Sequence, residues 1–328
     1  MKLSLLFLFS LVLYSCDGAR ILLLGPFGSK SHKTFFMPIA EALAERGHHI
    51  TVITSFPAKG KVENIREIYL KEESEKSVPV DDVDFFEMRK AQGLTSIVPR
   101  FWFLGGFVFT IYDGFVNNKE FKQLLREEKF DLVMVDAIFN DFCLPIADMW
   151  KVPVITVSPG MGPPWVLGNM GVPYHTASHP STWTAFDNQM TFSQRLLNTL
   201  ELTLALAARK LFIINPLNSR IRKDFPEART IQEVERDVSL LIITGHPTLN
   251  FVRPLPPTVI ELSHTHIKPI KPLPAVPSSQ HFERIWLLWS QMFLIFRISP
   301  SLQMSPVKMD LFCSRWVLPL RARTSPPT

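Results

Sequence analysis

The segment ARILLLGPFGSKSHKTFFMPIAEALAERGHHITVIT (19–54) decides the fold. Residues 19–24 form an apolar run typical of a strand buried on both faces, and the glycine and proline within 25–31 end that strand. Apolar residues at helical spacing then predict a helix over 34–46, closed by a glycine. Residues 48–54 predict a second strand. The segment is therefore predicted to be a βαβ unit of a parallel sheet.

A second unit of the same kind follows further along the chain. Residues 130–135 predict a strand that ends at Asp136, residues 142–150 a helix and residues 152–157 the next strand. Two βαβ units predict an α/β protein with a Rossmann-like, doubly wound parallel sheet. In such sheets, ligands bind outside the carboxyl ends of the strands.

Two polar side chains are predicted at that rim. His32 lies in the loop predicted after the first strand, and its imidazole can serve as a general base because it titrates near neutral pH. Asp136 ends its own strand and can fix the histidine tautomer by accepting the ring N–H. Taken alone, His32 also fits a solvated histidine near a helix start, and Asp136 fits a helix N-cap or turn residue.

Composition excludes several classes of protein. The 328 residues carry a net charge of +5, but residues 281–328 hold six Lys/Arg against two Asp/Glu, so the rest of the chain is nearly neutral and shows no basic stripe for nucleic acid. Residues 1–18 resemble a secretory signal peptide. The two cysteines that follow, Cys143 and Cys313, form no disulfide framework, and no spacing of metal ligands is present.

The remaining segments are less regular. Residues 63–83 are charged and predicted to be mostly surface, and 118–129 predict a helix. The apolar stretch 101–112 fits a helix or a loop. Residues 191–214 predict a helix whose broad apolar face packs on a core or, as the alternative, lies on a membrane surface. That helix carries one polar line, made of Gln194, Asn198, Glu201 and Arg209.

The predicted organisation has four parts. A signal peptide at 1–18 precedes a Rossmann-like acceptor-binding domain at 19–252. A proline-rich linker at 253–280 and a poorly ordered tail at 281–328 follow.

Several motifs together resemble the animal UDP-glycosyltransferases, the UDP-glucuronosyltransferase family. They are GSKSHKTFFMPIAEALAERGHHITVIT (28–54), FDLVMVDAIF (130–139), DNQMTFSQRLLN (187–198) and HPTLNFVRPLPPTVIELSHTHIKPIKPLP (246–274). The resemblance implies the amino-terminal half of a GT-B fold, which binds a small lipophilic acceptor, while the carboxyl half binds a UDP-sugar as co-substrate. It implies no permanently bound cofactor.

By position in these motifs, His32 matches the family's general base and Asp136 the carboxylate that supports it. The apolar loops expected near 101–109 and 163–170 are assigned to the acceptor by location. Their candidate contacts are Phe101, Phe103, Phe107, Trp165 and Met170.

The carboxyl-terminal part departs from the family. Ser263-His264 stand where the family usually has a glycine pair, and no glycine follows Gly245, although glycine loops are what hold diphosphates. Residues 281–328 show neither a βαβ pattern nor a membrane-spanning run. The sequence therefore predicts that the donor domain and the carboxyl-terminal anchor are missing.

Three functions stay open at this point. The chain is an enzyme of sugar transfer to a lipophilic hydroxyl, inactive alone and taking UDP-sugar only with a donor domain supplied. Alternatively, it is a truncated, non-catalytic isoform that binds lipophilic ligands or pairs with full-length subunits as a homo- or hetero-oligomer. The third is a plain lipophile-binding protein. Each is expected in the secretory pathway, in the endoplasmic reticulum lumen or at its membrane surface.

Overall fold

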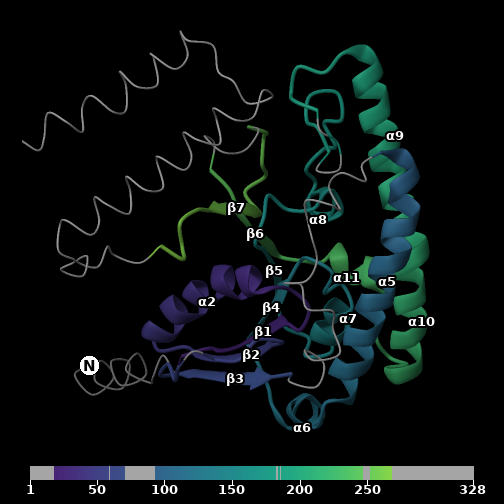
Figure 1. Cartoon of the computed structure of the whole chain (residues 1–328). Coiled ribbons are helices and arrows are strands. Elements are labelled where there is room, and N and C mark those ends of the chain that lie inside the picture. Colours follow the sequence, from purple (N-terminus) through teal and green to yellow (C-terminus); the bar gives the residue numbers. More distant parts are fainter. Residues whose placement is uncertain are drawn as a thin grey trace, which may run out of the picture. The chain divides into compact units, whose positions relative to one another are not determined.

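Seven parallel strands form one sheet in the computed structural model, which describes residues 18–58, 60–70, 93–181, 184, 186–246 and 252–267. Their order across the sheet is β3-β2-β1-β4-β5-β6-β7 (Figure 1). The strands are β1 (Arg20–Gly25), β2 (His49–Thr54), β3 (Ile65–Tyr69), β4 (Leu132–Asp136), β5 (Val154–Ser158), β6 (Leu240–Thr244) and β7 (Val259–Leu262).

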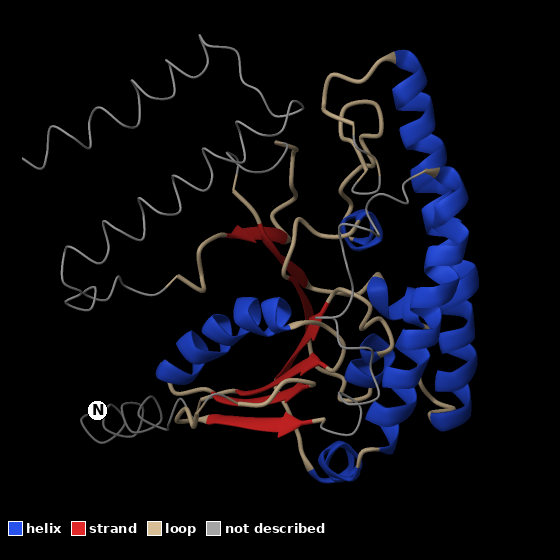
Figure 2. Ribbon diagram, in the orientation of Figure 1, coloured by secondary structure: helices blue, strands red, loops and turns tan. Residues whose placement is uncertain are grey.

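The helices are α2 (Lys30–Glu45), α5 (Leu94–Asn117), α6 (Lys119–Glu127), α7 (Cys143–Asp148), α8 (Pro164–Asn169), α9 (Phe192–Arg209), α10 (Asn215–Asp224) and α11 (Ile231–Glu235). A π-helical stretch, η2 (Lys210–Ile214), joins α9 to α10 without a break. Figure 2 shows α2 on one face of the sheet and the long helices α5, α9 and α10 on the other.

The central strand β1 explains this layering. Successive side chains of a strand point to opposite faces, so a run of apolar residues supplies both faces at once. Ile21 and Leu23 pack with residues of α2, whereas Leu22 and Leu24 pack in the larger core that includes α5. The predicted Rossmann-like, doubly wound parallel sheet is confirmed.

The strand order places a topological switch point at β1. The chain runs outward from β1 to β2 and β3, then returns to lay β4 on the other side of β1. In open α/β sheets, ligands bind outside the carboxyl ends of the strands at such a point.

Helix α2 begins four residues earlier than predicted. It starts at Lys30, with Ser29 in extended conformation as its N-cap, and the backbone N–H of His32 donates to the Ser29 carbonyl at 3.0 Å. His32 therefore lies in the first helical turn, and its predicted place in a loop is wrong. The polar first turn carries no apolar periodicity, which is why the sequence pattern starts later.

The stretch 63–83, predicted as charged and mostly surface, contains the unpredicted strand β3 within its described residues 63–70, where only Ile68 and Leu70 are buried. The apolar stretches near 101–109 and 163–170 are helical, within α5 and α8, rather than loops. The predicted helix over 118–129 is confirmed as α6, capped by the Asn118 side chain, which accepts from the Phe121 N–H.

The sheet extends past the predicted domain boundary at residue 252. Strand β7 lies within the stretch predicted as a linker and pairs in parallel with β6 along four residues. A four-residue strand among prolines is too short to show the alternation of apolar and polar residues that predicts a strand. Residues 1–17 of the predicted signal peptide (1–18), the predicted linker from residue 268 and the predicted tail at 281–328 lie outside the described residues.

Helix α9 buries its polar line instead of its whole apolar face. Asn198, Glu201 and Arg209 are 1%, 2% and 7% exposed, while Phe192 is 84% exposed. Leu196, Leu197 and Leu200 are also exposed, so the predicted packing of the broad apolar face holds only for residues such as Leu202, Ala205 and Ala208.

Among the described helices, α5 alone has the length and apolar composition needed to cross a membrane. Eight of its residues are buried, and they include Ile97, Phe101 and Val108. Core helices of globular proteins have the same composition.

Candidate functional site

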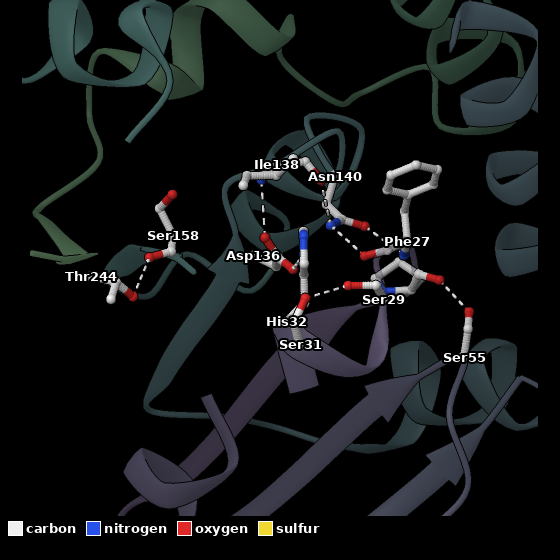
Figure 3. A network of polar contacts seen from close by, with 11 residues as sticks. Phe27, Ser29, Ser31, His32, Ser55, Asp136, Ile138, Asn140, Ser158 and Thr244 are labelled. Atoms are coloured by element: carbon white, nitrogen blue, oxygen red, sulfur yellow. Dashed lines mark hydrogen bonds and ion pairs between the residues drawn. The ribbon is translucent and has the colours of Figure 1, made fainter. Parts of the chain in front are cut away.

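The side chains of His32 and Asp136 meet at the switch point of the sheet. The Nδ1 atom of His32 lies 2.6 Å from Oδ2 of Asp136, a hydrogen bond between residues 104 positions apart (Figure 3). His32 lies in the first turn of α2, which follows β1, and Asp136 is the last residue of β4. Because β1 and β4 are neighbours in the sheet, the strand order brings the two side chains together.

Asp136 is held by a second hydrogen bond. Its Oδ1 accepts from the backbone N–H of Ile138 at 3.0 Å, and its side chain is fully buried. The next helix, α7, begins only at Cys143, so Asp136 is no helix N-cap. It closes the turn after β4 with one oxygen and binds the histidine with the other.

This geometry fixes the tautomer of His32. An ionised carboxylate only accepts hydrogen bonds, so Nδ1 of the ring carries the proton that Asp136 binds. Nε2 is left with a free lone pair. Because the His32 side chain retains 16% exposure, that lone pair can reach a ligand at the rim.

Two opposing electrostatic effects act on the pair. Burial raises the pKa of the Asp136 carboxyl above its ordinary value, while His32 and the Ile138 N–H act to lower it. The buried Asp136 carboxylate, which contacts Nδ1 directly, is the group placed to stabilise an imidazolium at this position.

Asn140 ties the loops after β1 and β4 together. Its Oδ1 accepts from the Phe27 N–H at 2.8 Å, and its Nδ2 donates to the Phe27 carbonyl at 3.0 Å. The Ser55 hydroxyl in turn donates to the Pro26 carbonyl. Asn140 carries no signal in the sequence, because no local pattern marks a side chain that hydrogen-bonds to a residue 113 positions away.

Similarity to known proteins extends over most of the chain. Residues 21–281 match the UDP-glucoronosyl and UDP-glucosyl transferase family. The chain belongs to this family. Its members named below are transferases, so the chain comes from a family of enzymes.

The chain spans about half the length of the curated relatives it matches. It is 29% identical over 255 residues to the UDP-glycosyltransferase UGT5 of Dactylopius coccus, with 76% of this chain and 48% of the relative covered. It is 28% identical over 261 residues to the 2-hydroxyacylsphingosine 1-beta-galactosyltransferase of Homo sapiens, with 78% and 47% covered.

A solved structure, the glycotransferase of kitacinnamycin, superposes with a TM-score of 0.41 at 12% identity. The superposed region covers 72% of this chain and 48% of the chain of that structure.

The residues proposed from their location as acceptor contacts occupy three different settings. Phe101 and Trp165 are 1% and 6% exposed and pack edge to face with ring centroids 6.3 Å apart. Phe103 is 55% exposed and packs against Phe107 at 4.8 Å. Met170 lines a small cavity together with Asp136.

A row of aromatic rings connects the rim to this core. Phe27, the second residue after β1, packs edge to face on Phe139 at 5.7 Å, and Phe139 lies 6.3 Å from Trp165. Both Phe27 and Phe139 are half-buried. Sequence reasoning did not single them out, because each is a lone aromatic in a loop.

No cluster of three or more His, Cys, Asp or Glu that could hold a metal ion occurs among the residues the structure describes. His32 and Asp136 place an imidazole and a carboxylate together at the rim, and this pair suits proton transfer.

Gly28 leaves the space that the His32 ring fills. Its φ is +151°, and a Cβ atom there would lie 2.9 Å from Nδ1 of His32. We expect Gly28→Ala to lower the free energy of unfolding by about 1–3 kcal/mol through backbone strain, and to displace the ring as well. Denaturant unfolding and the NMR signals of the His32 ring measure the two effects.

Gly171→Ala is the matched control. Gly171 also has a positive φ, of +82°, but a Cβ there meets nothing within 4 Å. It therefore keeps the strain without the collision, and only the unfolding free energy changes. Unshifted His32 ring signals in Gly28→Ala would contradict the steric argument.

Proposed function

We propose that this chain forms the acceptor-binding half of an enzyme that transfers a sugar, glucose or glucuronic acid, from a UDP-sugar to the hydroxyl of a small lipophilic molecule. The observation that carries the proposal is the hydrogen bond of 2.6 Å between His32 Nδ1 and Asp136 Oδ2. It leaves Nε2 of His32 as a base at the rim where α/β sheets bind ligands.

In the proposed reaction, His32 acts on the acceptor hydroxyl. Nε2 takes the hydroxyl proton as the acceptor oxygen attacks the anomeric carbon, while the bond from that carbon to UDP breaks and UDP leaves from the opposite face. The new glycosidic bond thus has inverted configuration. Asp136 stabilises the imidazolium that forms and stays ionised itself.

The aromatic row supports a lipophilic acceptor. Phe27 is the second residue after β1 and lies five residues before His32, and its half-buried ring leaves apolar surface for an aromatic or aliphatic ligand. Phe103, Phe107 and Met170 stay candidates for further contacts. The buried Phe101 and Trp165 are candidates for supporting the rings of Phe27 and Phe139, because Trp165 packs against Phe139 and Phe101 packs against Trp165.

Placement as the amino-terminal half of a GT-B enzyme belongs to the same proposal, as do location in the secretory pathway and pairing with full-length family members. The support is the family match together with the signal-like residues 1–18.

A chimera tests the proposed function. Residues 1–267 of this chain are joined to the carboxyl-terminal half of the Dactylopius coccus UDP-glycosyltransferase UGT5 and assayed with UDP-glucose, UDP-glucuronic acid and a lipophilic phenol. We expect product of inverted anomeric configuration, measured by NMR of the glycoside. The complete relative serves as the positive control.

Two outcomes are informative about the chain itself. The full 328-residue chain, without the relative's half, is expected to bind the phenol with a measurable heat of titration. A chimera that folds and binds the phenol but makes no product, under conditions where the relative does, would overturn the proposal.

A further inference from the structure

A buried arginine pairs with Asp141, five residues after Asp136 in the chain. Arg209 ends α9 and is 7% exposed, and its Nη2 lies 2.6 Å from Oδ1 of Asp141 and 2.7 Å from Oε1 of Glu235. Its guanidinium stacks over the Trp165 ring at 5.1 Å from the centroid. The three charged residues come from α9, from the turn after β4 and from α11.

These charges compensate one another inside the core. Burial acts to lower the pKa of Arg209, but Asp141 and Glu235 outweigh it and raise that pKa above its ordinary value. Burial raises the pKa of Glu235, the Arg209 charge opposes this rise, and the negative charge of Asp141 adds to it. Neither carboxylate is paired with another cation among the described salt bridges.

The ion triad Arg209–Asp141–Glu235 adjoins Asp136. Asp136, Asp141 and Glu235 line the same small cavity, and the other polar residues lining it, Thr156, Asn140 and Asn169, are uncharged. From α2, His32 faces Asp136. From α7, Cys143 lies close by, and burial raises the pKa of its thiol, so it is uncharged at neutral pH.

The triad also restrains the turn that carries Asp136. Asp141 follows Asn140 directly in the chain, and Asn140 makes the two hydrogen bonds that hold Phe27. Holding Asp141 therefore fixes one end of the turn 137–141, which begins directly after Asp136. Isolated carboxylates at this depth would be costly, and an unpaired one would pull the turn toward water.

We propose that Arg209 is a positioning residue of the His32–Asp136 pair, which holds the turn after β4 through Asp141 and offsets the negative charge that Asp141 and Glu235 place beside Asp136. Its importance for catalysis rests on the proposed function. Its effect on the charge of the pair does not, and that effect is measurable in the chain without any turnover.

The electrostatic part is tested with Asp141→Asn in the full chain. The substitution removes one negative charge next to the pair and leaves Arg209 in place, so protonation of the pair becomes less favourable. We expect the NMR titration midpoint of the His32 ring signals to fall by about half a pH unit or more. Asp113→Asn is the matched control, because Asp113 forms an exposed ion pair with Arg220.

The restraining part is tested with Arg209→Met and Arg209→Lys. We expect exchange of the His32 Nδ1 proton with water to become at least about tenfold faster in Arg209→Met, with most of the protection restored in Arg209→Lys. If Arg209→Met does not fold, the Asp141→Asn titration decides alone. A midpoint in Asp141→Asn equal to that in Asp113→Asn would overturn the proposal, whether or not the chimera transfers sugar.

Discussion

Replacing His32 by alanine in the chimera is expected to lower kcat at least about a hundredfold, while KM for the acceptor changes little. A positioned general base contributes roughly 10²–10⁴ in rate, and its loss removes an interaction made mainly in the transition state. The His32 side chain packs in the first turn of α2 and is partly exposed, so its truncation leaves the core intact. Steady-state kinetics at saturating UDP-sugar measure the effect.

His49→Ala is the control for this experiment. His49 is exposed and begins β2, so it lies at the amino ends of the strands, away from the rim. Its replacement is expected to leave kcat unchanged. A His32→Ala chimera that keeps most of its rate would place the base on another residue.

Asp136→Asn is expected to lower kcat of the chimera by about a thousandfold. An amide can donate to Nδ1 of His32, which would move the ring proton to Nε2 and remove the lone pair that takes the acceptor proton. The Asn side-chain oxygen can still accept the Ile138 N–H. The melting temperature should therefore change little compared with the rate.

The opposite pattern would assign Asp136 a structural role. If Asp136→Asn lowers the melting temperature strongly while kcat per folded molecule stays intact, the carboxylate serves the turn after β4 and not the histidine. Asp131→Asn is the control variant for these measurements. The Asp131 side chain accepts the Arg20 N–H at 2.8 Å at the amino ends of β1 and β4, away from the rim.

The sequence was sufficient to predict the centre of the sheet. β1, β2, β4 and β5 are apolar or β-branched runs closed by turn residues, and each was predicted within one or two residues. β3, β6 and β7 were not predicted. β3 and β7 lie at the two edges of the sheet, where half or more of a short strand stays in contact with water and carries charged side chains. β6 is an interior apolar strand of five residues, and an apolar run that short does not distinguish a strand from a buried helix.

Only the part of the site that follows from the order of the strands could be predicted from the sequence. His32 and Asp136 were predicted together because the carboxyl ends of β1 and β4 meet at one rim. Asn140 and Arg209 act through contacts with residues 113 and 68 positions away, which no local spacing encodes. The polar line of α9 was visible in the sequence, but its burial follows from the carboxylates it meets.

The hydrogen bond between His32 and Asp136 has a kinetic consequence for folding. The unit of β1, α2 and β2 pairs strands that are neighbours in sequence, whereas β4 must close a loop of about a hundred residues before it can lie beside β1. During synthesis, β1 therefore emerges with its carboxyl end complete but its histidine without a carboxylate. The nascent chain completes its base only when the slower, long-range pairing of β4 with β1 is made. A polypeptide arrested before β4 therefore contains His32 but lacks the Asp136 carboxylate that orients it.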